Sequence, residues 1–371
     1  MTATKTPTSP LLDEHTGLAA HFTDFAGWQM PLKYDSELAE HHAVRNAAGL
    51  FDLSHMGEIS VSGPAAGAML DYALTGELSK IGVGKAKYSL LCSAEGGVID
   101  DLVVYRLTDD QFLVVANAAN APTVFRELVT RADGFAVSVE DQSYQTALIA
   151  VQGPLAQSIV QSLVSVPDAE SVAELKYYAV SRSVVAGIDV LLARTGYTGE
   201  DGFELYVPNA QSVQLWRALL AATISRGGVP AGLACRDTLR LEAGMALYGH
   251  ELNLGTNPYE AGLGRVVRLN KNFVGHDALQ GFSDQDARCK LVGLQGAGRR
   301  AARAGYTVLD AAGEFAVGNI TSGALSPTLG YPIALAYVNV EFSDAGTELS
   351  VDIRGKRESF VVTPSPFYRR P

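Results

Sequence analysis

The first segment that could carry chemistry contains two adjacent aspartates. Residues 96–105 begin with paired glycines, which predict a tight turn leading into a strand. Because side chains alternate along a strand, Asp101, Val103 and Tyr105 would share one face and Asp100 the other. A carboxylate at a strand mouth, beside an apolar residue and a tyrosine, suits a general base or a stabiliser of positive charge. The competing interpretation is that both aspartates shape the turn and cap backbone amides, and the spacing alone favours this second interpretation.

A second candidate segment is rich in glycine. Residues 194–205 contain three glycines within seven positions, which predicts a backbone that bends sharply and lets a ligand approach. Tyr197 offers a flat ring and a hydroxyl, and Glu204 stands inside an apolar strand expected over residues 203–207. A carboxylate there needs a partner, and a ligand edge with two adjacent N–H donors, such as that of a pterin, would match it. The alternative is an ordinary hairpin with Glu204 on its solvent face.

Arginines mark a third segment. Residues 236–243 are expected to form a short helix that ends at Gly244, with Arg236 and Arg240 one turn apart. The first turn of a helix is a good place for contacts with an anion or a carbonyl group. A solvated pattern of charges at positions i and i+4 would explain the same residues without any function.

The composition excludes several classes of protein. The 371 residues carry a formal net charge of −11, which argues against nucleic-acid binding because phosphate contacts need a basic face. No apolar run approaches the ~20 residues of a membrane-spanning helix. The seven histidines show no metal-ligand spacing, so we expect no metal. Catalysis would therefore use an organic cofactor.

The cysteines and the start of the chain bear on the compartment. Cys92, Cys235 and Cys289 are far apart and show no Cys-x-x-Cys spacing, which is typical of reduced thiols in a cytoplasmic protein. Residues 1–10 are polar and lack the apolar core of a signal peptide, so they are expected to form a frayed end.

Mixed helices and strands are expected to position the candidate segments. Hydrophobic periodicity predicts helices over residues 38–48 and 155–164, and two more that follow possible caps at Asn120 and Asn209. Strands are predicted over residues 58–61, 102–107, 112–116, 189–193 and 203–207. The polar residues 108–111 predict a hairpin between the second and third of these strands.

The character of the chain changes near Lys290. Short β-type runs over residues 291–294, 307–309, 333–340, 349–353 and 359–362 are punctuated by Gly, Pro, Asn and Asp, without a clear helix. This pattern predicts a small antiparallel barrel or sandwich. The polar residues 283–286 predict the domain boundary, which gives a first region over residues 1–282 and a C-terminal domain over residues 283–371.

Several of these segments, taken together, resemble the aminomethyltransferase family, the T-protein of the glycine cleavage system. The matching pieces run nearly from end to end and are residues 25–31 (FAGWQMP), 49–57 (GLFDLSHMG), 87–89 (KYS), 96–102, 194–204, 232–244, 273–275 (FVG), 321–323 (TSG) and 326–330 (SPTLG). Any one piece is weak evidence, but the whole set in this order is highly specific.

The resemblance implies an α+β fold, a three-lobed, cloverleaf-like folate-binding body with a C-terminal antiparallel β-barrel. By position, Asp101 matches the family's essential aspartate. The residues implied to line or hydrogen-bond the folate are Met56, Tyr88, Val103, Tyr105, Tyr197, Glu204 and Arg236. A folate-contacting tyrosine near the C-terminus of some members is not carried over, because Phe367 occupies the corresponding place beside Tyr368.

The implied reaction takes an aminomethyl group from the sulfur of a lipoylated carrier, the H-protein, onto tetrahydrofolate. Ammonia, 5,10-methylenetetrahydrofolate and the dihydrolipoyl carrier would be the products. The implied partners are the H-protein and folate, with neither nucleic acid nor membrane. Tetrahydrofolate would be a co-substrate, and no metal or flavin is implied.

Two other functions share the resemblance. One is a stand-alone tetrahydrofolate-dependent demethylase acting on a methylated amine, thioether or aryl ether; the missing flavin domain argues only against the oxidase type. The other is a non-catalytic folate-binding protein that assists iron–sulfur assembly. Such relatives carry a Lys-Gly-Cys-Tyr segment, whereas residues 271–275 read KNFVG here, without cysteine.

Overall fold

The computed structural model describes residues 7–282 and 287–370, which divide into two compact units. The first unit takes the chain up to Leu70, then Leu78–Tyr88 and Leu102–Asp237. The second takes Asp71–Glu77, Ser89–Asp101 and the chain from Thr238 on. The predicted boundary between residues 282 and 283 adjoins residues 283–286, which lie outside the described residues, so this boundary stays a prediction.

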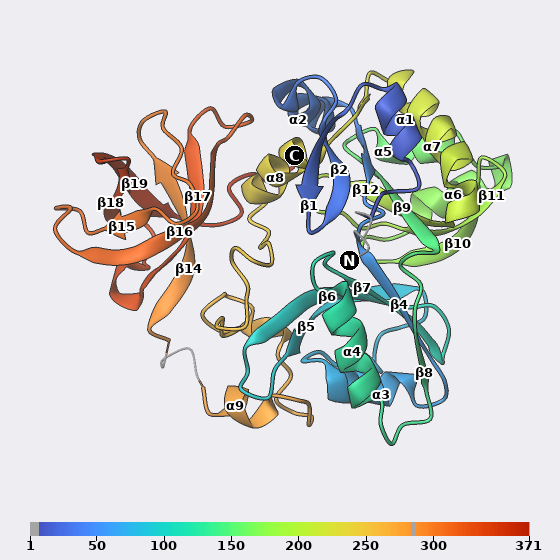
Figure 1. The fold of residues 1–371 in the computed structure, drawn as a ribbon, viewed down its shortest axis with the longest axis horizontal. Helices are drawn as coiled ribbons and strands as arrows, with labels where there is room; N and C mark the ends of the chain where they lie inside the picture. The colour runs from blue at the N-terminus through green and yellow to red at the C-terminus, as the bar shows by residue number, and fades with distance from the viewer. Residues whose placement is uncertain (1–6, 283–286, 371) are drawn as a thin grey trace, which may run out of the picture. The chain divides into compact units, whose positions relative to one another are not determined.

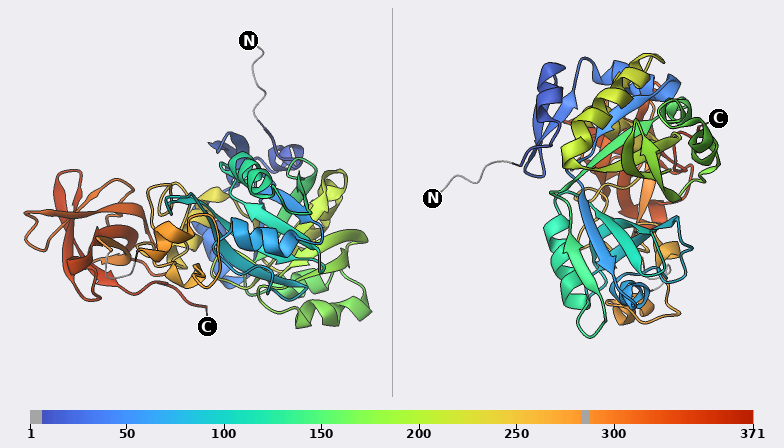
Figure 2. Two further views of the ribbon diagram at one scale, coloured as in Figure 1. Left: turned by 90° about the horizontal axis from the view of Figure 1, so that it is seen from below. Right: turned by 90° about the vertical axis from the view of Figure 1, so that its right-hand side faces the viewer.

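A six-stranded sheet forms one half of the first unit (Figure 1). Its strands, in spatial order, are β10 (Val180–Val185), β11 (Ile188–Ala193), β12 (Gly202–Pro208), β9 (Thr146–Gln152), β3 (Gly49–Asp52) and β13 (Val229–Pro230). The long helix α7 (Asn209–Ile224) packs against β9, β12 and β3, as Figure 2 shows. Val151, Phe203 and Leu205 bury their side chains in the same hydrophobic core as Trp216 of α7. Because strand side chains alternate, Glu204 lies on the opposite face of the sheet.

A five-stranded sheet lies largely in the first unit, and only the end of β5 and the start of β6 belong to the second. Its order is β5 (Lys85–Cys92), β6 (Val98–Arg106), β7 (Gln111–Ala116), β4 (Gly57–Ser62) and β8 (Ser138–Asp141). Helix α4 (Ala121–Arg131) packs on β4 and β8, and α3 (Ala66–Ala73) follows β4 in the chain. The predicted hairpin is confirmed, since β6 and β7 pair antiparallel across residues 107–110.

Shorter elements complete this part of the chain. They are α1 (Leu12–Gly17), the hairpin of β1 (His21–Phe25) and β2 (Trp28–Lys33), α2 (Glu37–Asn46), α5 (Ala156–Gln161), α6 (Val166–Glu174) and α8 (Leu233–Glu242). Two predicted caps differ from the structure. Asn120 precedes α4 but its side chain makes no capping hydrogen bond, and Pro208 rather than Asn209 precedes α7.

The expectation of a frayed end was wrong for residues 7–10, while residues 1–6 lie outside the described residues. Ser9 is buried and its hydroxyl donates a hydrogen bond to the carboxylate of Asp52. The backbone oxygen of Pro7 accepts from the amide of Gln29. Polar composition alone misjudged the segment, because its polar groups have partners far along the chain.

The predicted C-terminal barrel is confirmed (Figure 1, orange to red). Its closed order is β14 (Cys289–Gly296), β17 (Pro332–Asn339), β16 (Ala316–Leu325), β15 (Thr307–Leu309), β18 (Glu348–Ile353) and β19 (Lys356–Thr363), and the pairings are antiparallel. The other elements of the second unit are α9 (His276–Gln280) and the 3-10 turns η1 (Gly264–Val266) and η2 (Val340–Phe342).

Strand β16 was missed because glycines interrupt it. A Cβ on Gly318 would lie 2.2 Å from the backbone oxygen of Tyr337, and one on Gly323 would lie 2.1 Å from that of Ala302. Glycine is therefore required by the close approach of neighbouring backbone, although in the sequence it suggests a turn.

Candidate functional site

The eight predicted site residues come from several elements. Met56 lies between β3 and β4, Tyr88 on β5, Asp101, Val103 and Tyr105 on β6, Tyr197 between β11 and β12, Glu204 on β12 and Arg236 on α8. Seven of them are half-buried, whereas Tyr105 is completely buried. Asp101 is the last residue of its segment in the second unit, and the other seven belong to the first unit.

Glu204 is the centre of a hydroxyl network. Thr195 donates from Oγ1 to Oε2 of Glu204 at 2.5 Å, and the Tyr105 hydroxyl donates to the same oxygen at 3.3 Å. The hydroxyls of Tyr105 and Thr195 lie 2.9 Å apart, and Tyr206 donates to the Tyr105 hydroxyl at 3.3 Å. Burial raises the pKa of the Glu204 carboxyl above its ordinary value, against the opposing effect of the Thr195 hydrogen bond and the positive charge of Arg236.

The other oxygen of this carboxylate is open to a ligand. Both hydrogen bonds of Glu204 go to Oε2, and within residues 7–282 and 287–370 no partner contacts Oε1. The residues opposite Glu204 on the neighbouring strands are Ala150 and Ala193, whose methyl groups leave room above the sheet. A carboxylate accepts from about four directions, so Glu204 can still receive two N–H donors from one ligand edge. These contacts rule out the interpretation of Glu204 as a purely solvated side chain.

Arg236 and Tyr197 form a second pair. The guanidinium carbon of Arg236 lies 4.6 Å from the centre of the Tyr197 ring, which is within the range of a cation–π contact. Arg236 stands in the first turns of α8, as the sequence predicted, although the helix begins earlier, at Leu233. Its charge acts electrostatically on Glu204, so the glycine-rich turn and α8 contribute to one environment.

Arg240, one turn further along α8, has a different role. It is almost completely buried and donates to Glu251 at 3.0 Å and to the hydroxyl of Ser322 at 2.7 Å. These contacts lie inside the second unit. The interpretation of a solvated i and i+4 charge pattern is therefore wrong for this arginine, whose role is structural.

Ion pairs hold the glycine-rich turn between β11 and β12. Arg194 donates to both carboxylate oxygens of Asp201, at 2.9 and 2.6 Å. Arg45 of α2 pairs with Glu200 at 2.8 Å, and both side chains are only 4% exposed. A bidentate pair and a buried pair fix both the register and the orientation of this turn.

The segment before Met56 carries a buried polar chain that the sequence did not reveal. His15 contacts Asp52 at 2.8 Å through Nε2, and the Tyr34 hydroxyl lies 3.0 Å from the other ring nitrogen. Asp52 ends β3, four residues before Met56. The Ser54 amide donates to Asp52 at 2.9 Å, but the side-chain partners Ser9 and His15 lie far back in the sequence, so no local pattern could have indicated them.

His55 stands directly beside Met56. Burial, followed by the positive charge of Arg236, lowers the pKa of His55 to about 4, so the ring is neutral at pH 7. Its edge-to-face partner is Phe25, at 5.2 Å between ring centres. Among the described residues Nδ1 has no hydrogen-bond partner. A neutral ring here avoids a second positive charge next to Arg236.

Glu58 is a further buried acid that sequence reasoning missed. On β4 it lies opposite Val115 of β7, and Val115 lies opposite Val103 of β6. Residues paired in this way share one face, so Glu58 lies on the same face as Val103 and Tyr105. Neither of its carboxylate oxygens has a partner among the described residues, and burial raises its pKa well above the ordinary value.

Replacing Glu58 by glutamine is expected to raise stability more at pH 8 than at pH 5. Because the folded-state pKa lies above the ordinary value of 4.5, the folded chain holds this proton where the unfolded chain has released it. Stability is therefore lost as pH rises from about 4.5 through the folded pKa, and glutamine removes that loss. We expect a gain of about 1–3 kcal/mol at pH 8, measured by denaturant unfolding. The exposed Glu348→Gln is the control, and an equal gain at both pH values would contradict the prediction.

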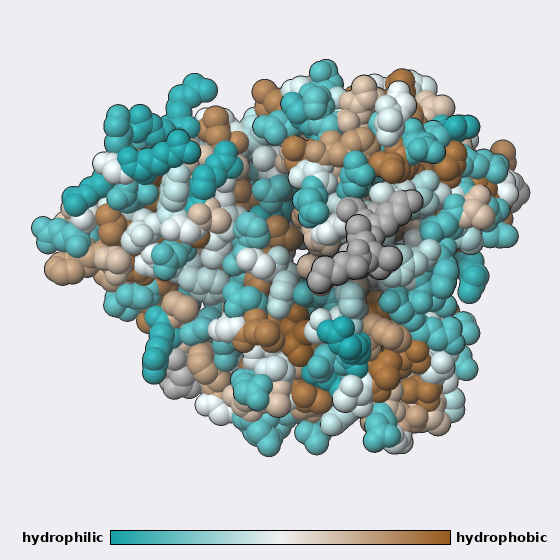
Figure 3. Space-filling model, viewed as in Figure 1, coloured by the Kyte–Doolittle hydropathy of each residue, from teal (hydrophilic) through white to brown (hydrophobic). Residues whose placement is uncertain are grey.

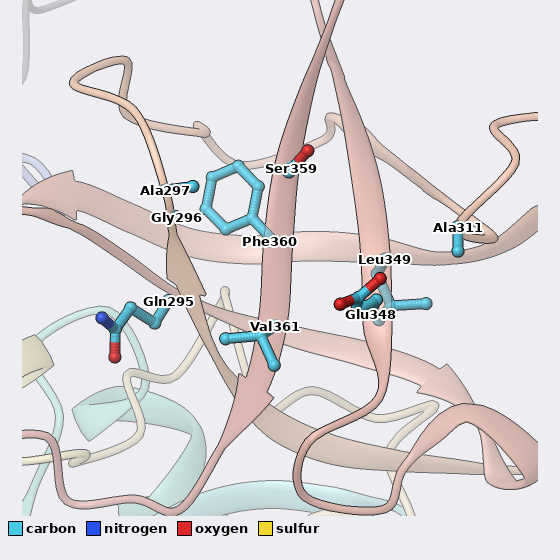
Figure 4. Close-up of a pocket in the computed structure, with 9 residues that line it drawn as sticks. All are labelled: Gln295, Gly296, Ala297, Ala311, Glu348, Leu349, Ser359, Phe360 and Val361. Carbon is cyan, nitrogen blue, oxygen red and sulfur yellow. The ribbon is translucent and has the colours of Figure 1, made fainter.

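The barrel has its own pocket, shown in Figure 4. It has a volume of about 320 Å³ and is lined by residues of β14, β18 and β19, together with Ala297 and Ala311. The Phe360 ring lies beside Gly296, and Glu348 supplies the carboxylate. None of the predicted site residues lines it. Hydrophilic side chains gather over the barrel at the upper left of Figure 3.

Within the described parts of the chain, no group of three or more His, Cys, Asp or Glu side chains is arranged to hold a metal ion. In the same residues, no helix combines the length and the apolar character needed to span a bilayer.

Two family models match the chain. The model described as the GCVT N-terminal domain matches residues 11–271, and the one described as the glycine cleavage T-protein C-terminal barrel domain matches residues 290–369. Relatives named aminomethyltransferase include that of Cutibacterium acnes, 56% identical, with 98% of each chain covered. That of Thermotoga maritima is 46% identical, with 97% of each chain covered.

A solved structure matches over the same length. It is the crystal structure of the glycine cleavage system aminomethyltransferase T from Bartonella henselae, which is 36% identical to this chain. The TM-score is 0.91, and 99% of each chain is covered. The likeness therefore includes both the N-terminal region and the barrel.

Proposed function

The chain belongs to the aminomethyltransferase family of the glycine cleavage system, and on this premise we propose that Glu204 binds the pterin edge of tetrahydrofolate while Asp101 acts on its reactive nitrogens. The protein is a one-carbon transferase, an aminomethyltransferase of the glycine cleavage system. The folate, its binding residues and the carrier are the proposed part.

The observation that carries the proposal is the state of the Glu204 carboxylate. Thr195 and Tyr105 donate to Oε2, and Oε1 has no partner among the described residues. A pterin presents two adjacent N–H donors, and the two acceptor positions that remain on Oε1 can receive them. The Arg236 charge favours the ionised carboxylate that such binding needs. The Tyr197 ring, held by Arg236, offers a flat surface for the folate.

Each remaining residue has a proposed task. Asp101 orients or deprotonates a folate amine, or stabilises positive charge at the carbon that is transferred. Val103, at the next same-face position of β6, forms an apolar wall together with Met56, and Tyr88 adds a further contact. Tyr105 is completely buried, so it acts through Glu204 rather than on the folate.

When bound, tetrahydrofolate supplies the amines that accept the one-carbon unit. Such amines react well only when they are held close to the carbon, and positioning can supply several kcal/mol of the barrier. Glu204 and Tyr197 would provide this positioning. We propose that the donor is the aminomethylated lipoyl group of the H-protein, and that ammonia and 5,10-methylenetetrahydrofolate leave the site.

Ammonia release tests the proposal directly. The purified protein is expected to release ammonia and form methylenetetrahydrofolate from aminomethylated lipoyl carrier only when tetrahydrofolate is present. A methylated amine offered in place of the carrier is the matched control, and it is expected to give no turnover. Turnover with the methylated amine but not with the carrier would replace the proposed donor by that of a demethylase.

We place this reaction in the cytoplasm. Among the described residues none of the three cysteines forms a disulfide, and Cys92 and Cys235 are buried. Burial raises the pKa of the Cys235 thiol, which suits a reduced, unreactive side chain.

A further inference from the structure

We propose that Gln152 is a positioning residue of the folate site. Its side-chain amide holds the two threonines on either side of Tyr197, and in this way it sets the positions of Tyr197 and of the Glu204 carboxylate. The inference rests on the proposed function and assigns a role to a residue outside the predicted site.

The Gln152 amide is buried and uses both of its ends. It is the last residue of β9 and is only 2% exposed. Its Nε2 donates to the backbone oxygen of Thr195 at 3.0 Å, and its Oε1 accepts from the Thr198 hydroxyl at 2.9 Å. A carbonyl oxygen can only accept, so the NH₂ group must face Thr195 and the amide can adopt only one orientation.

Thr195 connects this amide to the ligand-binding carboxylate. Its backbone oxygen is held by Gln152, and its hydroxyl donates to Glu204 at 2.5 Å. A shift of the Thr195 backbone therefore moves the donor that orients Glu204. On the other side of Tyr197, the Thr198 hydroxyl donates to Gln152 and accepts from the amide of Glu200 at 3.3 Å.

The same amide explains why two positions of the glycine-rich segment, residues 194–205, are glycine. A Cβ on Gly196 would lie 1.9 Å from Oε1 of Gln152, and one on Gly202 would lie 2.2 Å from Nε2. Neither distance is possible for real atoms. Both positions therefore require glycine, because the Gln152 amide occupies the space that a side chain would take. Gln152 packs directly against these two glycines, and this close packing fixes the position of the amide.

The turn has other anchors that do not involve Gln152. Arg194 pairs with Asp201, and Arg45 pairs with Glu200 while also donating to the Thr198 backbone oxygen at 2.8 Å. Loss of the amide should therefore leave the turn in place and loosen the part around Thr195 and Tyr197. This predicts a defect in folate binding that exceeds the defect in stability.

Gln152→Glu is the sharpest test, because it keeps the shape and changes only the donor. When ionised, the new carboxylate places an acceptor against the Thr195 carbonyl oxygen, so the hydrogen bond to Thr195 is lost. When protonated, it can donate to Thr195 and accept from Thr198 as the amide does. We expect tetrahydrofolate affinity, measured by calorimetry as a ratio to wild type, to be at least about tenfold weaker at pH 8.5 and to recover to within about threefold at pH 5.5.

Three comparison variants separate positioning from folding. Gln152→Leu should lose tetrahydrofolate affinity to the same extent at both pH values, because leucine cannot form the hydrogen bonds to Thr195 and Thr198 at either pH. Thr198→Val removes one hydrogen bond more gently, and it should raise KM for tetrahydrofolate several-fold with kcat at saturation little changed. Gln161→Leu is the matched control, since Gln161 also donates from Nε2 to a backbone oxygen, that of Ala169, at 2.8 Å, away from the turn. It should lose stability without changing folate affinity.

The outcomes distinguish the two proposals. Wild-type affinity in Gln152→Glu and Gln152→Leu, with folate bound normally by the wild type, would overturn the role of Gln152. A pH-independent loss in Gln152→Glu, equal to that of Gln152→Leu, would overturn it as well. Absence of folate binding by the wild type would instead remove the proposed function.

Discussion

Replacement of Asp101 by asparagine is expected to lower kcat by a factor of about 10²–10⁴, with the fold and the folate affinity retained. Proton transfer by a positioned side chain contributes a factor of this size, and the asparagine amide can neither take a proton nor stabilise positive charge. Asp101 is half-buried on β6, so the change exposes no buried charge. The measurement is ammonia release under saturating carrier and tetrahydrofolate, with folate affinity determined separately by calorimetry.

Asp100 supplies the matched control for this experiment. It is the preceding residue, is completely buried, and by strand alternation points to the other face. Asp100→Asn should therefore lower the melting temperature more than turnover. Near-wild-type turnover of Asp101→Asn would remove Asp101 from the mechanism.

Replacement of Glu204 by glutamine is expected to weaken tetrahydrofolate binding about 10²-fold. The amide keeps the shape but turns one acceptor into a donor, which then faces an N–H group of the pterin. Two charge-assisted hydrogen bonds are lost or weakened, at roughly 1.5–3 kcal/mol each. Titration calorimetry measures the effect, and unchanged affinity would show that the pterin assignment is wrong.

The pH dependence of binding gives the Glu204 experiment a second readout. Burial raises the pKa of this carboxyl, and the proposed binding needs its ionised form. Wild-type affinity should therefore fall as pH drops through the raised pKa, because a proton must be displaced on binding. Glu204→Gln should not show this fall in affinity at low pH, whereas the exposed Glu348→Gln in the barrel should still show it. The same fall in affinity at low pH in both variants would show that another group titrates.

The elements were predictable where their signals are local. Alternating runs separated by turn residues indicated the C-terminal barrel, and the β6–β7 hairpin followed from the polar residues between two β-rich segments. Two of the failures share one cause, contacts with residues distant in the chain. Strand β16 contains glycines demanded by neighbouring backbone, and residues 7–10 are ordered by partners such as Asp52.

The candidate site divides in the same way. From spacing alone, Asp101 and Glu204 had ordinary explanations as a turn former and a solvated strand residue. Only the ordered set of segments favoured a folate site. Tyr206 had a local signal, since it alternates with Glu204 on β12. Glu58 had none, because its face depends on the pairing of β4 with β7 and of β7 with β6.

The sequence by itself determined the C-terminal barrel, the β6–β7 hairpin and the residue types that stand at the candidate site. Secondary-structure propensity and hydrophobic alternation act over a few residues, so they can be recognised in the sequence. Only the tertiary structure decided which groups meet. Tyr105 donates to Glu204 across 99 positions, and Gln152 reaches Thr195 across 43. Such contacts depend on the register between strands that are distant in the chain, and a shift of one residue would turn each side chain to the other face.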